Sequence, residues 1–309
     1  MTTALWTPAR LPLLTGKRIV ITGGNAGLGY WAAEFLARRG ASVVIAARNE
    51  QKATSAIASI LSRAPRGDVS WVKLDLASLE SVEAAAAELS SAPIDALVAN
   101  AGVLGASKRG FTADGFELMF GTNVLGHFAL TARLMPTLLA TPGSRVVSLG
   151  SIAHEFNEMD LTDVMSDRNY SSFRTYSRSK LGVMLLAFEL DRRLRKAGLQ
   201  TSSLVAQPGF ALDGLGAARP GITNGKRSST LVRAALRPFA QGKDAGSLPT
   251  VRATADPAAQ GGEYWGPDGW RQLKGSPTVV QAKNRSRDIH TASALWNMAE
   301  TMTGLTLAV

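Results

Sequence analysis

The chain has 309 residues, of which 45% are hydrophobic and 19% are charged, and its 34 basic and 24 acidic side chains give a net charge of +10. This length suffices for one large α/β domain or two ordinary domains with a sizeable core. Because the chain has no cysteine, disulfides, thiolate metal sites, iron–sulfur clusters and a cysteine nucleophile are excluded. The three histidines, His127, His154 and His290, are far apart in sequence, so we predict no metal site.

The positive charge has two interpretations: a basic surface that keeps the protein soluble, or attraction to an anionic cofactor, substrate, nucleic acid or membrane. Residues 216–309 hold 12 basic and 6 acidic side chains, which is more than half of the excess. Basic residues form no run of five and are not interleaved with aromatic residues, so we expect no nucleic-acid partner. No apolar run resembles a signal peptide or a membrane span, and we expect a cytoplasmic protein without a membrane partner.

Short apolar runs alternate with Ala-rich helical patterns in the first two-thirds of the chain. The expected strands are 18–22, 42–46, 69–73, 96–98, 145–149 and 200–205, and the expected helices are 27–39, 51–63, 78–90, 116–139 and 176–197. The strand runs are apolar throughout, which is typical of a parallel sheet covered on both faces. This alternation predicts a Rossmann-type, doubly wound α/β fold, and with no repeat or linker we expect residues 1–309 to form a single domain.

The last hundred residues have a different pattern, which predicts a variable region on the substrate side of the fold. We expect a mobile loop at 209–228, a substrate loop and helix region at 210–240 with its helix at 229–240, a further helix at 246–253 and a short strand at 262–264. Asp288 is predicted to cap a closing helix. The apolar face of that helix contains Ala292, Leu295, Trp296, Ala299 and Met302.

A glycine-rich turn follows the first expected strand and leads into the first expected helix. It reads Gly23-Gly24-Asn25-Ala26-Gly27-Leu28-Gly29. Glycines let the backbone turn sharply and approach a diphosphate closely, and the helix N-terminus then offers free N–H groups. The spacing T-G-x-x-x-G-x-G resembles the short-chain dehydrogenase/reductase family, in which this loop binds a nicotinamide dinucleotide.

The end of the second expected strand indicates which dinucleotide binds. NAD enzymes need a carboxylate there for the ribose 2′-hydroxyl, but Ala47 stands in its place and is followed by Arg48 and Asn49. A guanidinium can hold a 2′-phosphate with two hydrogen bonds, so we predict NADP(H). The alternative is a solvated surface arginine. Members of the family that are similar to retinol dehydrogenases carry an arginine at this position, which agrees with NADP(H).

Two further motifs resemble sequence motifs that lie beside the cofactor in the family. Asp75-Leu76, after the third expected strand, is similar to the acidic position on the adenine side, although Asp75 could instead only start a helix. Asn100-Ala101-Gly102, after the fourth expected strand, resembles the motif N-N-A-G with alanine in place of the first asparagine. The resemblance implies that this motif stabilises the sheet and leaves room beside the cofactor.

Tyr176 and Lys180 are four residues apart in an expected helix and therefore share one face. An ammonium beside a phenol is expected to lower the pKa of Tyr176 toward neutrality, where Tyr176 can donate and recover a proton. Ser151 follows the fifth expected strand at the position of the family's catalytic serine, and the resemblance implies that it holds the substrate oxygen against Tyr176.

Asn123 lies in an otherwise apolar helix and matches the family's N-x-x-G-x-F motif, which implies a role in bending that helix and placing a water beside Lys180. A buried asparagine satisfied by the backbone alone is the alternative. His127 is expected to be a packed helix residue rather than a ligand. His154 has two interpretations, as a pocket residue and as a residue outside the pocket.

Pro208-Gly209 resembles the family's P-G motif beside the nicotinamide, but Leu212-Asp213 stands where a hydroxyl residue is usual. The candidate substrate residues are mostly apolar and predict a small hydrophobic substrate. They are Val103, Leu104, Ile152, His154, Tyr170, Phe173, Phe210, Leu212 and Leu215.

These motifs predict an NADP(H)-dependent oxidoreductase, a short-chain alcohol dehydrogenase or carbonyl reductase of the retinol-dehydrogenase-like branch. It would interconvert a hydrophobic aldehyde or ketone and its alcohol. The alternatives are a non-catalytic NADP(H) sensor and a C=C reductase, although the C=C-reducing relative carries a functional cysteine that this chain lacks. The apolar helices 116–139 and 176–197 resemble those that form dimer or tetramer interfaces in the family. A buried core helix explains the same pattern.

Overall fold

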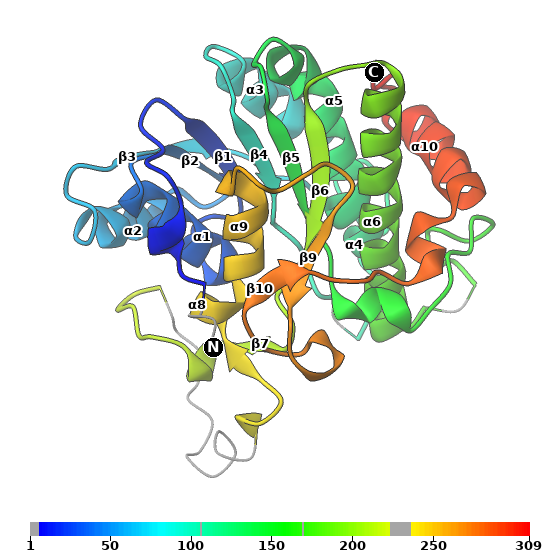
Figure 1. Cartoon of the computed structure of the whole chain (residues 1–309). Helices are drawn as coiled ribbons and strands as arrows, with labels where there is room; N and C mark the ends of the chain where they lie inside the picture. Colours follow the sequence, from blue (N-terminus) through cyan, green and yellow to red (C-terminus); the bar gives the residue numbers. More distant parts are fainter. Residues whose placement is uncertain (1–5, 106, 169, 223–235) are drawn as a thin grey trace.

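The computed structural model describes residues 6–105, 107–168, 170–222 and 236–309, and one eight-stranded sheet organises them (Figure 1). The strands, in their order across this sheet, are β10 (Pro277–Val279), β9 (Tyr264–Pro267), β6 (Ser202–Ala206), β5 (Arg145–Leu149), β4 (Ala96–Ala99), β1 (Arg18–Thr22), β2 (Ser42–Ala47) and β3 (Asp68–Lys73). All neighbours pair in parallel except β10, which is antiparallel to β9. The order reverses between β1 and β4, and such a switch point is where doubly wound sheets bind ligands.

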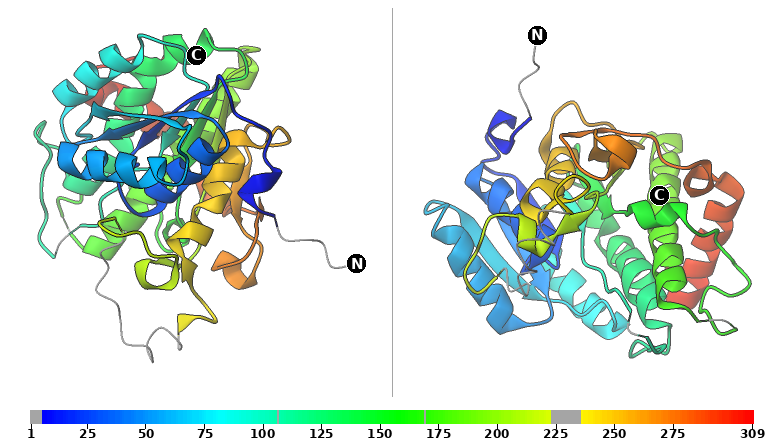
Figure 2. Two further views of the ribbon diagram at one scale, coloured as in Figure 1. Left: turned by 90° about the vertical axis from the view of Figure 1, so that its left-hand side faces the viewer. Right: turned by 90° about the horizontal axis from the view of Figure 1, so that it is seen from below.

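Helices cover both faces of the sheet, as Figure 1 and the two views of Figure 2 show. Their bounds are α1 (Gly27–Arg38), α2 (Glu50–Leu61), α3 (Leu79–Leu89), α4 (Leu118–Phe120), α5 (Gly126–Leu139), α6 (Ser172–Lys196), α8 (Lys243–Gly246), α9 (Leu248–Ala255) and α10 (Ile289–Thr303). One core cluster joins the sheet to α3, α5, α6 and α10, and a second joins it to α1, α2 and α9. The predicted Rossmann-type, doubly wound α/β fold is confirmed.

The expectation that every strand is apolar and buried on both faces is wrong for β3. This strand lies at the edge of the sheet, and its residues Asp68, Ser70 and Lys73 are exposed. An edge strand has a neighbour on one side, so part of it stays in water. The inner strands β1, β2, β4, β5 and β6 are buried as expected.

The helix expected at 116–139 is not continuous. A π-helical turn, Gly121–Leu125, separates α4 from α5, and Asn123 lies in the middle of this turn. A π-helical turn releases main-chain carbonyls from the regular ladder, so a side chain can bond them, and such turns are frequent at functional sites. Periodicity alone did not reveal this interruption.

The C-terminal region departs furthest from the predicted elements. The expected loop at 209–228 contains a short strand, β7 (Ala211–Leu212), which pairs in parallel with β8 (Gln241–Gly242). The strand expected at 262–264 lies at β9 instead, and β10 was not predicted. Of the helix expected at 229–240, residues 229–235 lie outside the described residues, and residues 237–239 form a turn.

The closing helix is confirmed as α10. Asp288 caps it, with its carboxylate accepting a hydrogen bond from the Thr291 N–H at 2.8 Å. The Trp296 ring packs edge-on against Phe128 of α5, and the Arg193 guanidinium of α6 lies 4.2 Å from the indole centroid. Helix α10 therefore covers part of the apolar face of α5 and α6 within the same chain.

Candidate active site

A cleft of about 580 Å³ opens beside the carboxyl ends of the central strands. Fourteen of the predicted site residues line it. They are Gly23, Asn25, Ala26, Gly27, Leu28, Arg48, Asn49, Asp75, Leu76, Asn100, Ala101, Gly102, Tyr176 and Lys180. Residues far apart in sequence therefore meet at the switch point of the sheet, in the place where this fold binds ligands.

Glycine is required at different positions of the first turn for different structural reasons. Gly23 and Gly27 adopt φ angles of +67° and +58°, in the left-handed region that favours glycine. Gly29 does not line the cleft. It lies in the first turn of α1, where a Cβ would come within 2.4 Å of Asn100 Nδ2 and 2.6 Å of the Gly23 carbonyl. Gly29 thus lets α1 pack closely on the loop, while Gly27 faces the cleft.

The end of β2 presents positive charge to the cleft. Arg48 is exposed and, within the described part of the chain, makes no hydrogen bond or ion pair. The Asn49 carboxamide caps α2 by accepting a hydrogen bond from the Lys52 N–H at 2.8 Å. Lys52 also lines the cleft, and the sequence reasoning missed it. Its position four residues after Arg48, at the start of a helix, was the available signal.

The loops after β3 and β4 are held by local hydrogen bonds. The Asp75 carboxylate accepts from the Ala77 N–H at 3.0 Å, so it forms a turn as well as lining the cleft. The Asn100 carboxamide donates to the Thr22 carbonyl at 2.8 Å and thereby ties β4 to β1. At Gly102 a Cβ would lie 3.5 Å from Lys180 Nζ, so this glycine keeps space beside the lysine.

Tyr176 and Ser151 form the centre of the candidate catalytic group. Tyr176 lies in α6, and Ser151 immediately follows the short link after β5 and caps the 3-10 turn Ile152–Glu155. Burial raises the pKa of Tyr176, and a hydrogen bond with the Ser151 hydroxyl opposes this shift. The predicted lowering by Lys180 is therefore wrong for the chain as it stands, because desolvation of the phenolate outweighs the other effects.

Lys180 is buried one helical turn after Tyr176. Its ammonium donates a hydrogen bond to the Leu149 carbonyl at 2.8 Å, and burial lowers its pKa to about 8. Among the described residues it has no other hydrogen-bond acceptor, which leaves N–H groups available where it lines the cleft. A buried ammonium with free donors is suited to hold a hydroxyl group of a ligand.

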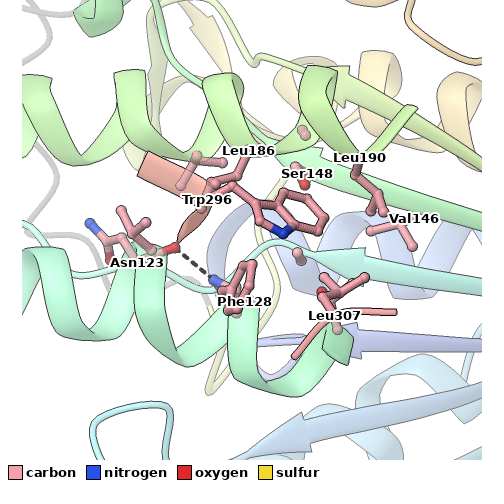
Figure 3. A pocket seen from close by; sticks show the side chains of 14 residues that line it. Asn123, Phe128, Val146, Ser148, Leu186, Leu190, Trp296 and Leu307 are labelled. Carbon is pink, nitrogen blue, oxygen red and sulfur yellow. Dashed lines mark hydrogen bonds between the residues drawn. The ribbon is translucent and has the colours of Figure 1, made fainter. Parts of the chain in front are cut away.

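Asn123 lies behind the cleft rather than in its lining. Its carboxamide accepts from the Val103 N–H at 2.8 Å and donates to the Val103 carbonyl at 3.1 Å and to Ser179 Oγ at 3.0 Å. The backbone and Ser179 together satisfy this buried amide. A small cavity of about 40 Å³ lies beside it, lined also by Ser148, Phe128 and Trp296 (Figure 3).

His154 does not line the cleft. It is fully buried behind Ser151, where its Nδ1 donates to the Ser151 carbonyl at 2.6 Å and its Nε2 accepts from the Lys283 N–H at 3.4 Å. Burial lowers the pKa of His154, so the ring is neutral at pH 7. The interpretation of His154 as a pocket residue is therefore wrong, because its ring supports the backbone of Ser151.

Pro208 and Gly209 lie outside the lining of the cleft. Gly209 has a φ of +65°, and a Cβ there would come within 2.2 Å of the Leu273 carbonyl, so the glycine permits a close approach to the C-terminal region. Of the predicted substrate residues, Val103 and Leu104 line the cleft. Phe173 and Phe210 are exposed, at 54% and 38%.

Two features are absent from residues 6–105, 107–168, 170–222 and 236–309. Within those ranges no group of three or more His, Asp or Glu side chains is placed to hold a metal ion. In the same part of the chain no helix combines the length and apolar character needed to cross a membrane.

Comparison with known proteins identifies the family. The sequence profile described as short chain dehydrogenase matches residues 17–212, which contain every predicted catalytic residue. The chain belongs to the short-chain dehydrogenase/reductase family and is an oxidoreductase of that family.

Individual relatives place it among retinol-dehydrogenase-like members. Retinol dehydrogenase 13 of Homo sapiens is 34% identical over 94% of this chain and 86% of its own length. Polyprenol dehydrogenase of Mus musculus is 38% identical over 65% of this chain and 62% of its own length. A crystal structure of an uncharacterised protein from Mycobacterium paratuberculosis is 33% identical, covers 99% of this chain and all of that one, and has a TM-score of 0.81.

The family binds NAD(P)(H), and the cleft fits such a dinucleotide. Gly27 faces the cleft at the N-terminus of α1, and Arg48 and Lys52 provide cations beyond β2. Lys180 of α6 has N–H groups that no acceptor among the described residues uses. Oxidised and reduced nicotinamide dinucleotides carry a diphosphate and two riboses, which need donors of this kind.

Proposed function

We propose that the protein is an NADP(H)-dependent oxidoreductase that interconverts a hydrophobic aldehyde or ketone and its alcohol. The observation that carries the proposal is that Tyr176 lines the same cleft as the glycine loop and as Lys180, which lies one helical turn further along α6. When bound, the nicotinamide would supply a hydride to the carbonyl carbon or accept one from the alcohol carbon.

The protein's own residues would handle the proton. In reduction, the Tyr176 phenol donates its proton to the carbonyl oxygen as the hydride reaches the carbon, so the carbonyl becomes an alcohol. Ser151 donates a hydrogen bond to the same oxygen and holds it against Tyr176. Lys180 would hold a ribose hydroxyl of the cofactor through the N–H groups that its bond to Leu149 leaves available. In oxidation the same groups act in reverse.

Arg48 and Lys52 support the choice of NADP(H) over NAD(H). Both cations line the cleft, and Ala47 precedes them where NAD enzymes place a carboxylate. The relatives named for retinol and polyprenol, together with Val103 and Leu104 in the cleft, favour a hydrophobic substrate. We also propose a cytoplasmic location, and a homodimer or tetramer as the alternative to a chain in which α5 and α6 are core helices only.

Consumption of NADPH over a panel of hydrophobic aldehydes and ketones tests this function, with NADH as the comparison cofactor. The variant Tyr176→Phe is expected to lose turnover while its dissociation constant for NADPH changes by less than about twofold, because the phenol moves the proton and contributes little to binding. Retained turnover in this variant contradicts the mechanism.

The same panel separates the two alternatives. NADPH binding with no consumption by any carbonyl favours a sensor. Reduction that yields a saturated ketone from an enone, and no alcohol from any carbonyl, favours a C=C reductase.

A further inference from the structure

A lysine from the C-terminal region lies over the glycine loop. Lys243 is the first residue of α8, which packs against α1, and its side chain lines the cleft. A Cβ added to Gly27 would lie 3.4 Å from Lys243 Nζ and 3.7 Å from its Cδ. The lysine therefore stands directly above the residue at which α1 begins. There the family's glycine loop offers only neutral N–H donors.

An acidic residue already neutralises this lysine. Lys243 Nζ lies 2.7 Å from Asp213 Oδ2. The short parallel pair β7 and β8 sets Leu212 opposite Gly242, so the residues that follow these two strands are neighbours. The two side chains are 27% and 38% exposed, which leaves the ion pair accessible to an anion that enters the cleft.

A second ion pair holds the same segment against α1. Arg219 donates to both carboxylate oxygens of Glu34, each at 2.7 Å, and its guanidinium lies 4.1 Å from the Trp31 ring centroid. Glu34 is fully buried in α1. Residues 213–219 are thus fastened to α1 and α8 at both ends, which keeps Asp213 and Lys243 close to the loop.

We propose that Lys243 binds the diphosphate of the dinucleotide and that Asp213 is an internal counter-ion that competes with this diphosphate. The inference rests on the proposed function, because it takes NADP(H) as the ligand. A diphosphate is doubly anionic, and an ammonium contributes a charge-assisted hydrogen bond that neutral N–H groups lack. Asp213 reduces the gain in affinity, because binding replaces one charged contact of Lys243 with another.

The location of Lys243 distinguishes its role from that of the other cleft cations. Arg48 and Lys52 reach the cleft from β2 and α2, on the side assigned to the 2′-phosphate, and Lys180 reaches it from α6. Loss of Lys243 should therefore weaken NADPH and NADH equally, since both carry the diphosphate. Loss of Arg48 should weaken NADPH alone.

Dissociation constants measured by fluorescence or calorimetry test this inference without turnover. Lys243→Gln is expected to weaken NADPH, NADH and adenosine 5′-diphosphate by about tenfold, the usual value of one charge-assisted hydrogen bond. Binding of adenosine 2′-monophosphate, which has no diphosphate, should not change. Lys243→Arg, which keeps the charge, should restore most of the affinity, and thermal unfolding of each variant verifies that it folds.

The substitution Asp213→Asn should change the affinity for NADPH in the opposite direction. It is expected to tighten NADPH binding several-fold in the wild-type background and to have no effect when combined with Lys243→Gln. The matched controls are Lys17→Gln and Glu83→Gln, each of which breaks one ion pair away from the cleft, Lys17 with Asp95 and Glu83 with Arg133.

The outcomes distinguish a failure of the proposed function from a failure of the role proposed for Lys243. A wild-type chain that binds neither NADPH nor NADH overturns the proposed function. A chain that binds them, with Lys243→Gln indistinguishable from Lys17→Gln, overturns only the role of Lys243. An equal loss of affinity for adenosine 2′-monophosphate, or an effect of Asp213→Asn that persists without Lys243, overturns it as well.

Discussion

The Thr22 hydroxyl and the His127 imidazole lie 2.9 Å apart and join the end of β1 to the first turn of α5. On its other side, His127 Nδ1 lies 3.0 Å from the Asn123 carbonyl in the π-helical turn (Figure 3, dashed line). A carbonyl only accepts, so Nδ1 carries the proton in the neutral ring. Nε2 must then accept from the Thr22 hydroxyl. The same Thr22 oxygen accepts the N–H groups of Asn100 and Ala101, each at 2.9 Å.

This arrangement connects the glycine loop to the helix that carries Asn123. Burial lowers the pKa of His127 to about 4, so the ring is neutral at pH 7 and keeps the tautomer that the two bonds require. His127 thus links the Thr22 hydroxyl to the Asn123 carbonyl. The expectation of a merely packed histidine missed both contacts.

The buried, neutral His127 predicts a stability that falls in acid. Between pH 6.5 and about 4 the unfolded chain protonates this histidine and the folded chain does not, so the free energy of unfolding decreases as the pH falls through that range. At pH 5 the loss is about 2 kcal/mol. Urea unfolding of the wild type and of His127→Gln should therefore show a difference at pH 7.5 that shrinks by about this amount at pH 5. A difference that is independent of pH contradicts the assignment.

Lys180 predicts a conflict between stability and activity. Its pKa of about 8 lies below the value of 10.5 expected in the unfolded chain, so burial of the ammonium destabilises the fold below pH 8. Lys180→Met should abolish turnover and yet raise the free energy of unfolding at pH 7 by about 2 kcal/mol, after the lost bond to Leu149 is allowed for. The gain should shrink as the pH rises from 8 to 10.5. Lys17→Met, at an exposed lysine, is the control, and a destabilised Lys180→Met chain at pH 7 would falsify the prediction.

Arg48 and Lys52 predict the cofactor preference. Replacing both by alanine should weaken NADPH binding by about tenfold or more and leave NADH binding within about twofold, because only NADPH carries the 2′-phosphate. The measurement is a pair of dissociation constants for each variant. If the affinities for NADPH and NADH fall equally, the two cations do not bind the 2′-phosphate. If neither affinity falls, Arg48 is a solvated surface arginine.

Local patterns accounted for much of the fold and of the candidate site. The strand, glycine turn and helix around Gly27 are consecutive in sequence, and Tyr176 and Lys180 are four residues apart in one helix. Their geometry follows from backbone preferences within a few residues. Asp288 likewise capped α10 as predicted, because a cap acts on the next turn of its own helix.

By itself the sequence determined the family, the order of the central elements and the residues available for chemistry, since each of these depends on short-range patterns. Tertiary structure decided what those residues touch. Lys243, from the C-terminal region, lies beside Gly27. His154 lies behind Ser151, where its ring accepts a hydrogen bond from the Lys283 N–H. The pKa of Tyr176 rose rather than fell. Contacts and desolvation of this kind arise only when segments distant in sequence pack together, and no local pattern records which segments those will be.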